Sequence, residues 1–264
     1  MKVLKLSLSA LMLFSLMTAI CYGQTAQDYY DKGIDYGVAG KFEEAQQEFT
    51  KALELDSFYT PAKVGLELVE DALKQIIKSR TALHLLRGIF YHNKGIYDDA
   101  VAECKKAIEI NPNYAGAHHS LGVAYGSKGM YYEAIAELKK AIEINPNYAG
   151  AYYNLGVLYG EKGMYDEEIA EYKKAIEVDP NHADTHYNLG VVYGNKGMYD
   201  EAIRELKKTI EINPNYADAY NNLAAAYYYK GEYSLAITYC DRAIELGYRV
   251  HSELLELLEP HRKR

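Results

Sequence analysis

The sequence lacks an excess of positive charge, and this narrows the class of partner. Its 264 residues include 29 Lys and Arg against 37 Asp and Glu, for a formal net charge of −8. Proteins that bind nucleic acid commonly present a basic face to the phosphates. The acidic composition therefore argues against nucleic acid as a partner. Tryptophan is absent too, whereas there are 28 tyrosines, because tyrosine recurs at fixed positions of an internal repeat.

Long apolar runs are also lacking, except near the beginning of the chain. Residues Leu6–Ile20 form an apolar stretch that follows Lys2 and Lys5 and contains no acidic residue. The stretch is shorter than the roughly 20 residues that a membrane-spanning helix needs. Its basic start and the small residues at its end are typical of a secretory signal. We therefore predict a signal peptide over residues 1–23, cleaved after Gly23, and an exported protein that is periplasmic or secreted.

Cys21 leaves a second interpretation of this leader open. In lipoprotein signals the acylated cysteine follows a small residue, whereas here the bulky Ile20 precedes Cys21. An acylated Cys21, or a leader that is not cleaved, would anchor the protein to a membrane. Contact with a membrane is expected only in those two cases.

A segment of 34 residues recurs along the rest of the chain. At residues 115–148 it reads AGAHHSLGVAYGSKGMYYEAIAELKKAIEINPNY, and two close copies follow directly. Three more divergent copies complete the set, whose bounds are 26–59, 81–114, 115–148, 149–182, 183–216 and 217–250. A fixed period of this size indicates a repeat architecture.

Each copy predicts two short helices with one apolar face. In the copy at 149–182, apolar residues recur at three- and four-residue steps in two stripes: Tyr152, Leu155 and Tyr159, then Ile169, Tyr172 and Ile176. This spacing is that of an amphipathic helix. Pro180 follows the second stripe and disfavours helix in the residue before it. Because two short helices cannot bury their stripes alone, the units must stack on one another.

Small residues predict where the two helices of a unit approach most closely. In the fourth copy these are Gly156 and Ala175, which carry little or no side chain. Two copies depart from this pattern. Thr209 replaces the alanine in the fifth copy, which predicts a slightly splayed unit there. Glu168 replaces an alanine that other copies have near the start of the second helix.

Two segments lie outside the period. Residues 60–80 contain Pro61, which suits a helix start, and apolar residues at helical spacing. We expect an inserted amphipathic helix over residues 60–80. Two arrangements stay open: a separate helix, or one continuous with the next helix from about Pro61 to Asn93. Residues 251–264 predict a capping helix followed by a basic tail, because a stacked array needs a terminal element with one polar face.

The repeat resembles the tetratricopeptide repeat family. In the third copy the matching residues are His118, Leu121, Gly122, Tyr125, Ala134, Leu138, Ala141 and Pro146. The resemblance covers residues 26–59 and 81–250. The tryptophan of the family is replaced by Tyr29, His84, His118, Tyr152, His186 and Tyr220. The resemblance implies an all-α, right-handed α-solenoid of six helix pairs, with an inserted helix, a C-terminal capping helix and a concave groove lined by the first helix of each pair.

Histidine spacing raises the question of a metal site. His182 and His186 lie four residues apart, and imidazole is a common zinc ligand. His186, however, shares its repeat position with His84 and His118, where the family has its large packing residue. We therefore predict a packing role for these histidines, and neither a metal nor a cofactor.

Neither the cysteines nor any sequence motif indicates catalytic activity. Cys104 and Cys240 occupy the same position in copies four periods apart. Stacked copies at that distance cannot bring two Cα atoms to the roughly 6 Å of a disulfide, so we predict buried free thiols. No Ser/His/Asp arrangement and no phosphate-binding loop stands out in the sequence. An enzyme is not predicted.

The candidate partner-binding residues lie on the first helices, and we call them the first-helix row. One position carries Ser120, Asn154, Asn188 and Asn222; the position before it carries His119, Tyr153, Tyr187 and Asn221; and one turn further on stand Val123, Val157 and Val191. In peptide-binding relatives an asparagine row at this place bonds the peptide backbone, and a carboxamide can both donate and accept as a peptide group requires. The same asparagines are equally well explained as part of the generic repeat. Acidic residues on first helices favour neutral or basic partners: Asp31, Asp35, Asp184 and Asp218.

These features together predict a non-enzymatic protein–protein interaction scaffold that binds a protein or an extended peptide in the groove. Two alternatives remain. One is a membrane-tethered factor for envelope or pilus assembly, similar to small repeat lipoproteins, which requires acylation at Cys21. The other is a structural spacer or a self-associating array, in which the first-helix row binds no partner.

Overall fold

The computed structural model describes residues 24–262, and every regular element in that range is helical. The contacts divide the chain into two compact units, one up to Ile144 and one from Asn145 onward. The predicted signal peptide and Cys21 lie outside the described residues. Within residues 24–262, no helix combines the length and the apolar character needed to cross a membrane.

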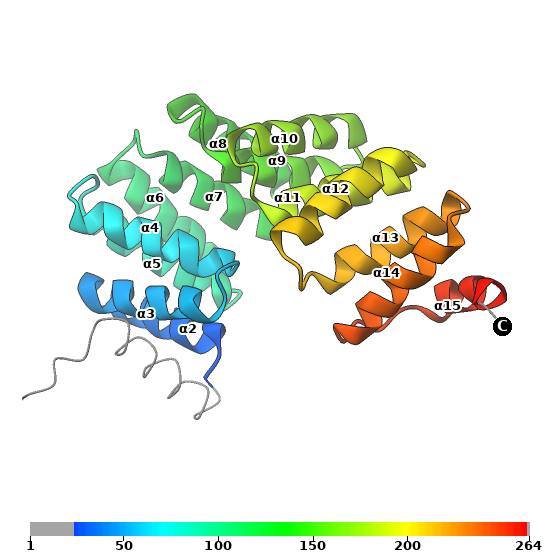
Figure 1. The fold of residues 1–264 in the computed structure, drawn as a ribbon. Helices are drawn as coiled ribbons and strands as arrows, with labels where there is room; N and C mark the ends of the chain where they lie inside the picture. The colour runs from blue at the N-terminus through cyan, green and yellow to red at the C-terminus, as the bar shows by residue number, and fades with distance from the viewer. Residues whose placement is uncertain (1–23, 263–264) are drawn as a thin grey trace, which may run out of the picture. The chain divides into compact units, whose positions relative to one another are not determined.

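The first unit consists of seven helices, coloured blue to green in Figure 1. They are α2 (Ala26–Val38), α3 (Phe42–Leu55), α4 (Thr60–Leu73), α5 (Ser79–Asn93), α6 (Tyr97–Ile110), α7 (Ala115–Ser127) and α8 (Tyr131–Ile144). Consecutive helices form three pairs, α2 with α3, α5 with α6, and α7 with α8, while α4 packs on α3.

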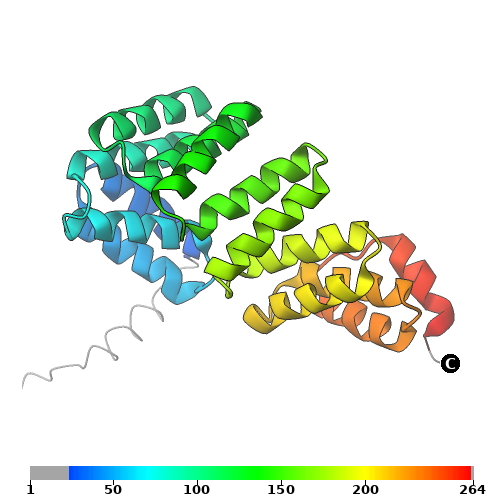
Figure 2. The same cartoon turned by 90° about the horizontal axis from the view of Figure 1, so that it is seen from above.

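The second unit contains three further pairs, which follow one another in Figure 2 from green to orange. They are α9 (Ala149–Glu161) with α10 (Tyr165–Val178), α11 (Ala183–Asn195) with α12 (Tyr199–Ile212), and α13 (Ala217–Tyr229) with α14 (Tyr233–Glu245). A shorter helix, α15 (Ser252–Leu258), and a 3₁₀ turn, Glu259–His261, end the unit. The predicted all-α fold of six helix pairs, with an inserted helix and a C-terminal helix, is confirmed.

A glycine in the left-handed region makes each tight turn within a pair. Gly163, between α9 and α10, has φ +71°. Its N–H donates to the Gly160 carbonyl at 2.8 Å, and the Met164 N–H donates to the Tyr159 carbonyl at 2.9 Å. These two bonds end a helix around a left-handed residue, which glycine adopts without a steric penalty. The chain therefore reverses within a few residues, and α10 returns along α9.

A small residue on the first helix faces a larger side chain on the second helix of each pair. A Cβ atom built on Gly156 would lie 2.5 Å from Cε1 of Tyr172, so no side chain fits there. The same relation joins four further pairs: Gly33 and Phe49, Gly88 and Cys104, Gly122 and Leu138, and Gly190 and Leu206. In the sixth pair the corresponding residues are Ala224 and Cys240, both fully buried. In this pair the first helix carries an alanine instead of a glycine, and the small cysteine on the second helix leaves room for its methyl group.

The predicted splaying of the fifth unit at Thr209 is wrong. Thr209 is fully buried, and its hydroxyl donates to the Glu205 carbonyl at 3.1 Å within α12. A Cβ atom built on Gly190 would lie 2.7 Å from Leu206 Cγ, as close as the 2.8 Å between Gly122 and Leu138 Cγ. The pair keeps its packing because the hydroxyl bonds to its own helix, so the polar group needs no extra space.

The inserted helix is separate from the next helix, which settles the question that the sequence left open. Helix α4 begins at Thr60, with Pro61 in its first turn, and ends at Leu73. The chain then reverses around Gln75, whose φ is +59°, and the Ile76 N–H donates to the Asp71 carbonyl at 2.9 Å. Ile77 is buried and holds this turn against the core. The turn uses a non-glycine residue in the left-handed region, so the sequence contains no glycine or proline to mark it.

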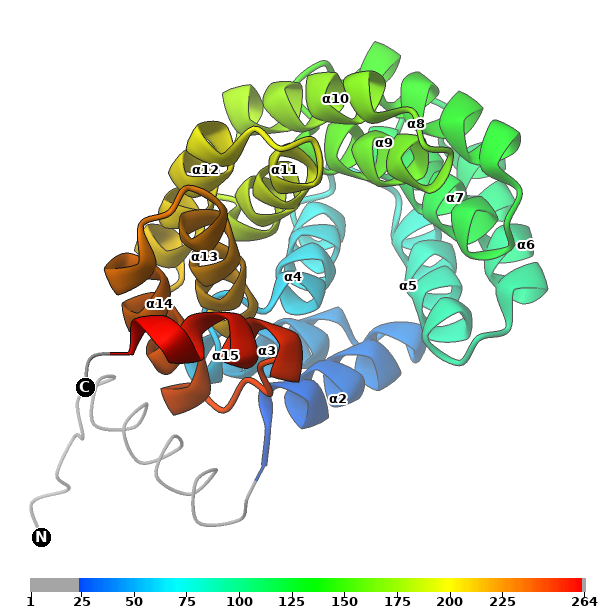
Figure 3. The ribbon, with the colours of Figure 1, turned by 90° about the vertical axis from the view of Figure 1, so that its right-hand side faces the viewer.

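Helix α15 covers the apolar end of the second unit. Leu258 is fully buried in a cluster that also contains Cys240 and Val250. The guanidinium of Arg262 donates to both oxygens of Asp241 on α14, at 2.6 Å and 3.2 Å. Figure 3 shows α15 after α14 at the end of the chain. These contacts fit the predicted capping role.

Candidate functional site

The eleven residues of the first-helix row lie on four helices and share one level of burial. His119, Ser120 and Val123 lie on α7 in the first unit, and the other eight lie on α9, α11 and α13 in the second. All eleven are half-buried. Each side chain therefore packs against its neighbours and still presents part of its surface to solvent.

In the second unit, tyrosine and asparagine of neighbouring repeats are hydrogen-bonded to each other. The Asn188 Nδ2 group donates to the Tyr153 hydroxyl at 3.2 Å, and the Asn222 Nδ2 group donates to the Tyr187 hydroxyl at 3.1 Å. The two residues of each bond are 35 positions apart, one more than the 34-residue period. Each bond therefore joins the tyrosine position of one repeat to the asparagine position of the next repeat. The carboxamide is thereby held in one orientation. It keeps further capacity, because it has two N–H donors and a carbonyl acceptor.

The two ends of this series differ from its middle. The Asn154 Nδ2 group donates to the Gly150 carbonyl of its own helix at 3.0 Å. Asn221 donates to Asn222 Oδ1 at 3.4 Å, and its own Oδ1 is buried without a hydrogen-bond partner among the described residues. The middle of the asparagine row therefore consists of Tyr–Asn pairs, and its two ends make other contacts.

The row tyrosines are supported by further rings and by acidic residues. Tyr187 stacks on Tyr216 with ring centroids 4.9 Å apart, and the Tyr216 hydroxyl donates to Asp184 at 2.9 Å. Burial raises the pKa of the Tyr153 hydroxyl, and the charge of Asp184 raises it further. Burial and the charge of Asp218 do the same to the pKa of Tyr187. A tyrosine hydroxyl is protonated at neutral pH even at its usual pKa of about 10, and these shifts extend that state to higher pH.

Two small cavities adjoin the row, one in each unit. In the second unit a cavity of about 140 Å³ is bordered by Val191, Asn222 and the ring of Tyr229, which stacks on Tyr199 with centroids 5.3 Å apart. Glycine and alanine residues on α11, α12 and α13 leave this space open. In the first unit a cavity of about 120 Å³ is lined by residues that include all three row residues of α7. Each is large enough to take a small apolar side chain.

The packing histidines have a partner that sequence analysis missed. His84, His118 and His186 each place Nδ1 within 2.7 or 2.8 Å of a glutamate 19 positions later, and these partners are Glu103, Glu137 and Glu205. In the fourth repeat Tyr152 replaces the histidine, and the Oε2 atom of Glu171 has no hydrogen-bond partner among the described residues. Comparing the two repeat positions across the copies would not have shown the pairing, because the glutamate is also present where tyrosine replaces the histidine, as Glu48 and Glu171.

The remaining candidate ligands and thiols serve packing. The His182 Nδ1 atom accepts from the Thr185 N–H at 3.3 Å at the start of α11, and His186 also contacts the Pro180 carbonyl at 3.1 Å. Across the described part of the chain, no group of three His, Cys, Asp or Glu residues could hold a metal ion. Cys104 and Cys240 are buried and free, and burial raises the pKa of the Cys104 thiol to about 12.

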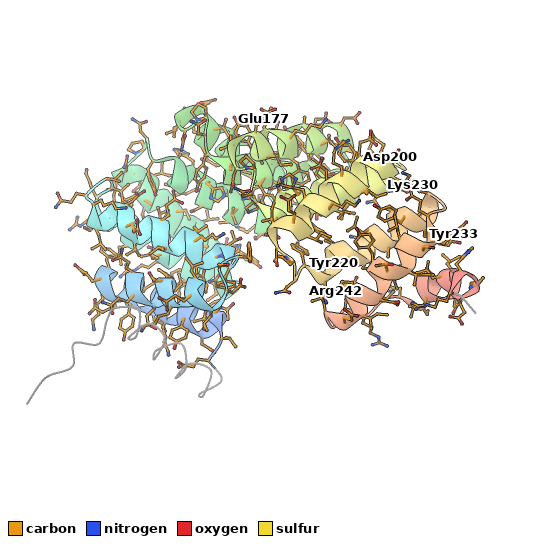
Figure 4. The ribbon with its side chains drawn as sticks, viewed as in Figure 1. Glu177, Asp200, Tyr220, Lys230, Tyr233 and Arg242 are labelled. Atoms are coloured by element: carbon orange, nitrogen blue, oxygen red, sulfur yellow. The ribbon has the colours of Figure 1, made fainter. Side chains whose placement is uncertain are left out.

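Contacts between neighbouring repeats also include ion pairs at the surface. Lys230 at the end of α13 lies 2.6 Å from Asp200 at the start of α12, and both are labelled in Figure 4. Lys196 and Asp166 repeat this contact at 2.8 Å in the preceding pair. The aspartates are largely exposed, so water and salt screen each ion pair and its contribution to stability is small. They lie apart from the first-helix row, which they leave to other residues.

Glu168 is a buried carboxyl group in the pair α9–α10, and it yields a prediction about stability. It lies against Gly160 and is 7% exposed. Burial raises its pKa, against the opposing effect of a hydrogen bond from Tyr172. Since the folded protein holds this proton more tightly, stability falls as the pH rises from the usual glutamate pKa of about 4.3 through the raised pKa of the folded state. Glu168→Gln should therefore raise the free energy of unfolding at pH 7 by about 1 kcal/mol.

Urea unfolding of the two proteins at pH 4 and pH 7 measures this effect. The difference should be small at pH 4 and appear at pH 7. Glu167→Gln is the matched control, because Glu167 is exposed in the same first turn of α10 and shares the favourable effect of the helix dipole. Equal changes for both substitutions at pH 7 would show that burial of Glu168 does not lower stability.

Comparisons with known proteins bear on the family. The family model described as TPR repeat matches residues 88–129, 127–163, 158–197 and 195–231, and the model described as tetratricopeptide repeat matches residues 217–246. Together these segments cover more than half of the chain. No curated protein matches the chain significantly.

Several solved structures share the fold. MamA is 33% identical over 61% of this chain and 94% of its own, with a TM-score of 0.56. PilF of Pseudomonas aeruginosa is 24% identical over 67% of this chain and 81% of its own, with a TM-score of 0.62. YrrB, described as a TPR protein with an unusual peptide-binding site, is 24% identical over 81% of this chain and 98% of its own, with a TM-score of 0.53.

Proteins built from this repeat are typically non-catalytic, and the fold supports protein–protein interaction in general. The matched segments, the helix pairs and the glycine that faces a large residue in most pairs all agree with the repeat pattern found in the sequence. The chain belongs to the tetratricopeptide repeat family.

Proposed function

We propose that this protein is a non-enzymatic scaffold that binds an extended peptide segment of a partner protein along the first-helix row. The observation that carries the proposal is the repeated Tyr–Asn hydrogen bond, Tyr153 with Asn188 and Tyr187 with Asn222. It places fixed polar groups at regular intervals beside half-buried valines. An extended peptide offers the complementary pattern of backbone polar groups and alternating side chains.

Orientation of the carboxamides is the physical basis of this binding. An asparagine that turns freely loses rotational freedom when it bonds to a ligand, whereas one held by a tyrosine hydroxyl has already lost it. Each carboxamide can then donate and accept with little further ordering. The small cavity beside Val191 takes an apolar side chain of the same peptide. Backbone bonds supply affinity for any sequence, and the cavity selects a small apolar residue.

A defined peptide tests this proposal. Peptides are selected against the full chain from a random dodecapeptide display library, and one is labelled for fluorescence anisotropy. Changing Asn154, Asn188 and Asn222 to alanine should raise its Kd at least tenfold, because each backbone hydrogen bond contributes about 1 kcal/mol. Circular dichroism at the assay temperature checks that the variant is folded.

The chain offers a matched control with the same three chemical changes. Asn147, Asn181 and Asn215 are exposed residues in the turns between repeats, at the same 34-residue spacing. Their change to alanine should leave the Kd within twofold of the original value. If the row variant and the turn variant bind the peptide equally well, the row is not the binding site, and the structural spacer becomes the better account.

We also propose that the protein acts outside the cytoplasm. The support is the leader itself, with Lys2 and Lys5 before an apolar stretch and small residues near Gly23. A mass measurement of the mature N-terminus tests this proposal. A chain that starts at Gln24 supports export without a lipid anchor, an acylated Cys21 supports the membrane-tethered alternative, and a chain that still starts at Met1 would contradict cleavage.

A further inference from the structure

The inserted helix α4 creates a third cavity, larger than the two beside the row. This cavity measures about 490 Å³ and lies within the first unit. One wall is α2, the second is the beginning of α4 with Tyr59 before it, and the third is the end of α5. Helix α2 contacts both α4 and α5, as can be followed in Figure 3. No other repeat can form this space, because only the first two are separated by an inserted helix.

The lining combines carboxylates with aromatic rings. Asp31 and Asp35 are exposed residues one helical turn apart on α2, so they lie on the same face of that helix. The aromatic walls are formed by Tyr30, Tyr59 and Phe90. Negative charge beside an aromatic face is the environment that a cationic group prefers, since the face of the ring is itself electron-rich.

The charge of Asp31 affects the pKa of an aromatic residue that lines the cavity. Burial raises the pKa of the Tyr59 hydroxyl, and the charge of Asp31 raises it further. One cation also borders the space. The Lys94 Nζ atom lies 5.6 Å from the centre of the Phe90 ring. An ammonium group therefore already contacts this ring. Two carboxylates against one ammonium leave the cavity negative.

Tyr30 adds a buried hydroxyl group to this lining. Tyr30 is 4% exposed and lines the cavity. Its hydroxyl oxygen accepts from the Asn93 Nδ2 group at 3.0 Å, while its own proton has no acceptor among the described residues. A tyrosine hydroxyl can donate as well as accept. A carbonyl oxygen of a bound peptide would supply the missing acceptor.

We propose that this cavity binds a basic side chain of a partner peptide, and that it prefers the planar guanidinium of arginine. A guanidinium can stack on the aromatic walls while its N–H groups bond to Asp31 and Asp35. The peptide carbonyl next to that side chain accepts from Tyr30. The inference rests on the proposed function, because it assigns a residue class to the partner at one position. The α2–α4–α5 cavity and the first-helix row are nevertheless formed by different residues.

A blocked pentapeptide Gly-Ser-Arg-Ser-Gly, titrated into the isotopically labelled full chain by NMR, tests the proposal. Saturable shifts are expected at the side-chain amides of Gln27 and Asn93, which border the cavity. The peptide with citrulline in place of arginine keeps the shape but removes the charge, and it should bind at least fivefold more weakly. The peptide with glutamate should show no saturable shifts at these groups.

Substitutions in the protein give the matching test. The double change Asp31→Asn and Asp35→Asn should weaken the arginine peptide at least tenfold. The control Asp99→Asn with Glu109→Gln removes the same charge from exposed positions of α6 and should change the affinity less than twofold. Lys94→Gln should strengthen binding, because it removes the ammonium that repels the ligand.

Each remaining outcome is decisive as well. Equal binding of the arginine and citrulline peptides, or tighter binding of the glutamate peptide, would overturn the proposal. A lysine peptide as strong as the arginine peptide would overturn the guanidinium preference. A library-selected peptide without basic residues separates the two proposals: if it binds through the row while the arginine pentapeptide fails, only the cavity is excluded.

Discussion

Gly156→Ala should destabilise the protein by about 2 kcal/mol, although alanine is the better helix former by about 1 kcal/mol. The added Cβ atom would lie 2.5 Å and 2.6 Å from two carbons of the Tyr172 ring, which is 2% exposed and has no room to move. Overpacking of this kind costs about 1–3 kcal/mol and outweighs the helix propensity. Urea unfolding followed by circular dichroism measures the change.

A second glycine provides the control for this prediction. Gly194 lies on α11, and a Cβ atom there would meet only the Cβ of Ala202, at 4.0 Å. Gly194→Ala should therefore stabilise the protein by about 0.5–1 kcal/mol. Tyr172→Cys recreates the Ala224 and Cys240 combination of the sixth repeat, and in that background Gly156→Ala should be nearly neutral. A Gly156→Ala protein as stable as Gly194→Ala would contradict the close contact with Tyr172.

His186→Leu should lower the free energy of unfolding at pH 7 by about 2–3 kcal/mol, because it leaves the Glu205 carboxylate without its main partner. The His186 Nδ1 atom lies 2.8 Å from that carboxylate, and His186 is 5% exposed. Burial alone would raise the pKa of Glu205, but the hydrogen bond and charge of His186, with a smaller effect of Arg204, lower it. The folded protein therefore stabilises the charged carboxylate.

The pH dependence of this effect follows from the direction of that shift. A carboxylate with a lowered pKa in the folded state contributes stability above the usual glutamate pKa of about 4.3, and the contribution disappears as the pH falls through the lowered value. The His186→Leu deficit should thus shrink below about pH 4. Adding Glu205→Gln to His186→Leu should restore at least half of the loss at pH 7. A deficit that is unchanged from pH 7 to pH 3 would mean that lost packing, and not charge, explains it.

The 34-residue period made the helix pairs predictable. Each stripe of apolar residues indicates one helix, and each turn within a pair has a glycine at the position that corresponds to Gly163. The end of α4 was not predictable in the same way. Gln75 adopts a left-handed conformation without a glycine, and the buried Ile77 that holds the turn is not distinguishable in sequence from the neighbouring exposed Ile76. Tertiary packing decided that boundary.

The candidate site was predictable only in part for a related reason. Aligning the copies shows which residues share a column, and this identified the row of Asn154, Asn188 and Asn222. It does not show contacts between different columns of neighbouring repeats, such as Tyr153 with Asn188. The cavity between α2, α4 and α5 was not predictable from the repeat, because it forms where the inserted helix interrupts the 34-residue period.

The central claim, that a peptide lies along the first-helix row, is tested most directly by intermolecular NOEs. The full chain is labelled at valine methyl groups and saturated with the unlabelled library-selected peptide. Val157 and Val191 should give NOEs to the peptide, whereas Val192, the buried neighbour on α11, and Val178, at the end of α10, should give none. NOEs at Val178 without any at Val157 or Val191 would place the peptide elsewhere and contradict the account.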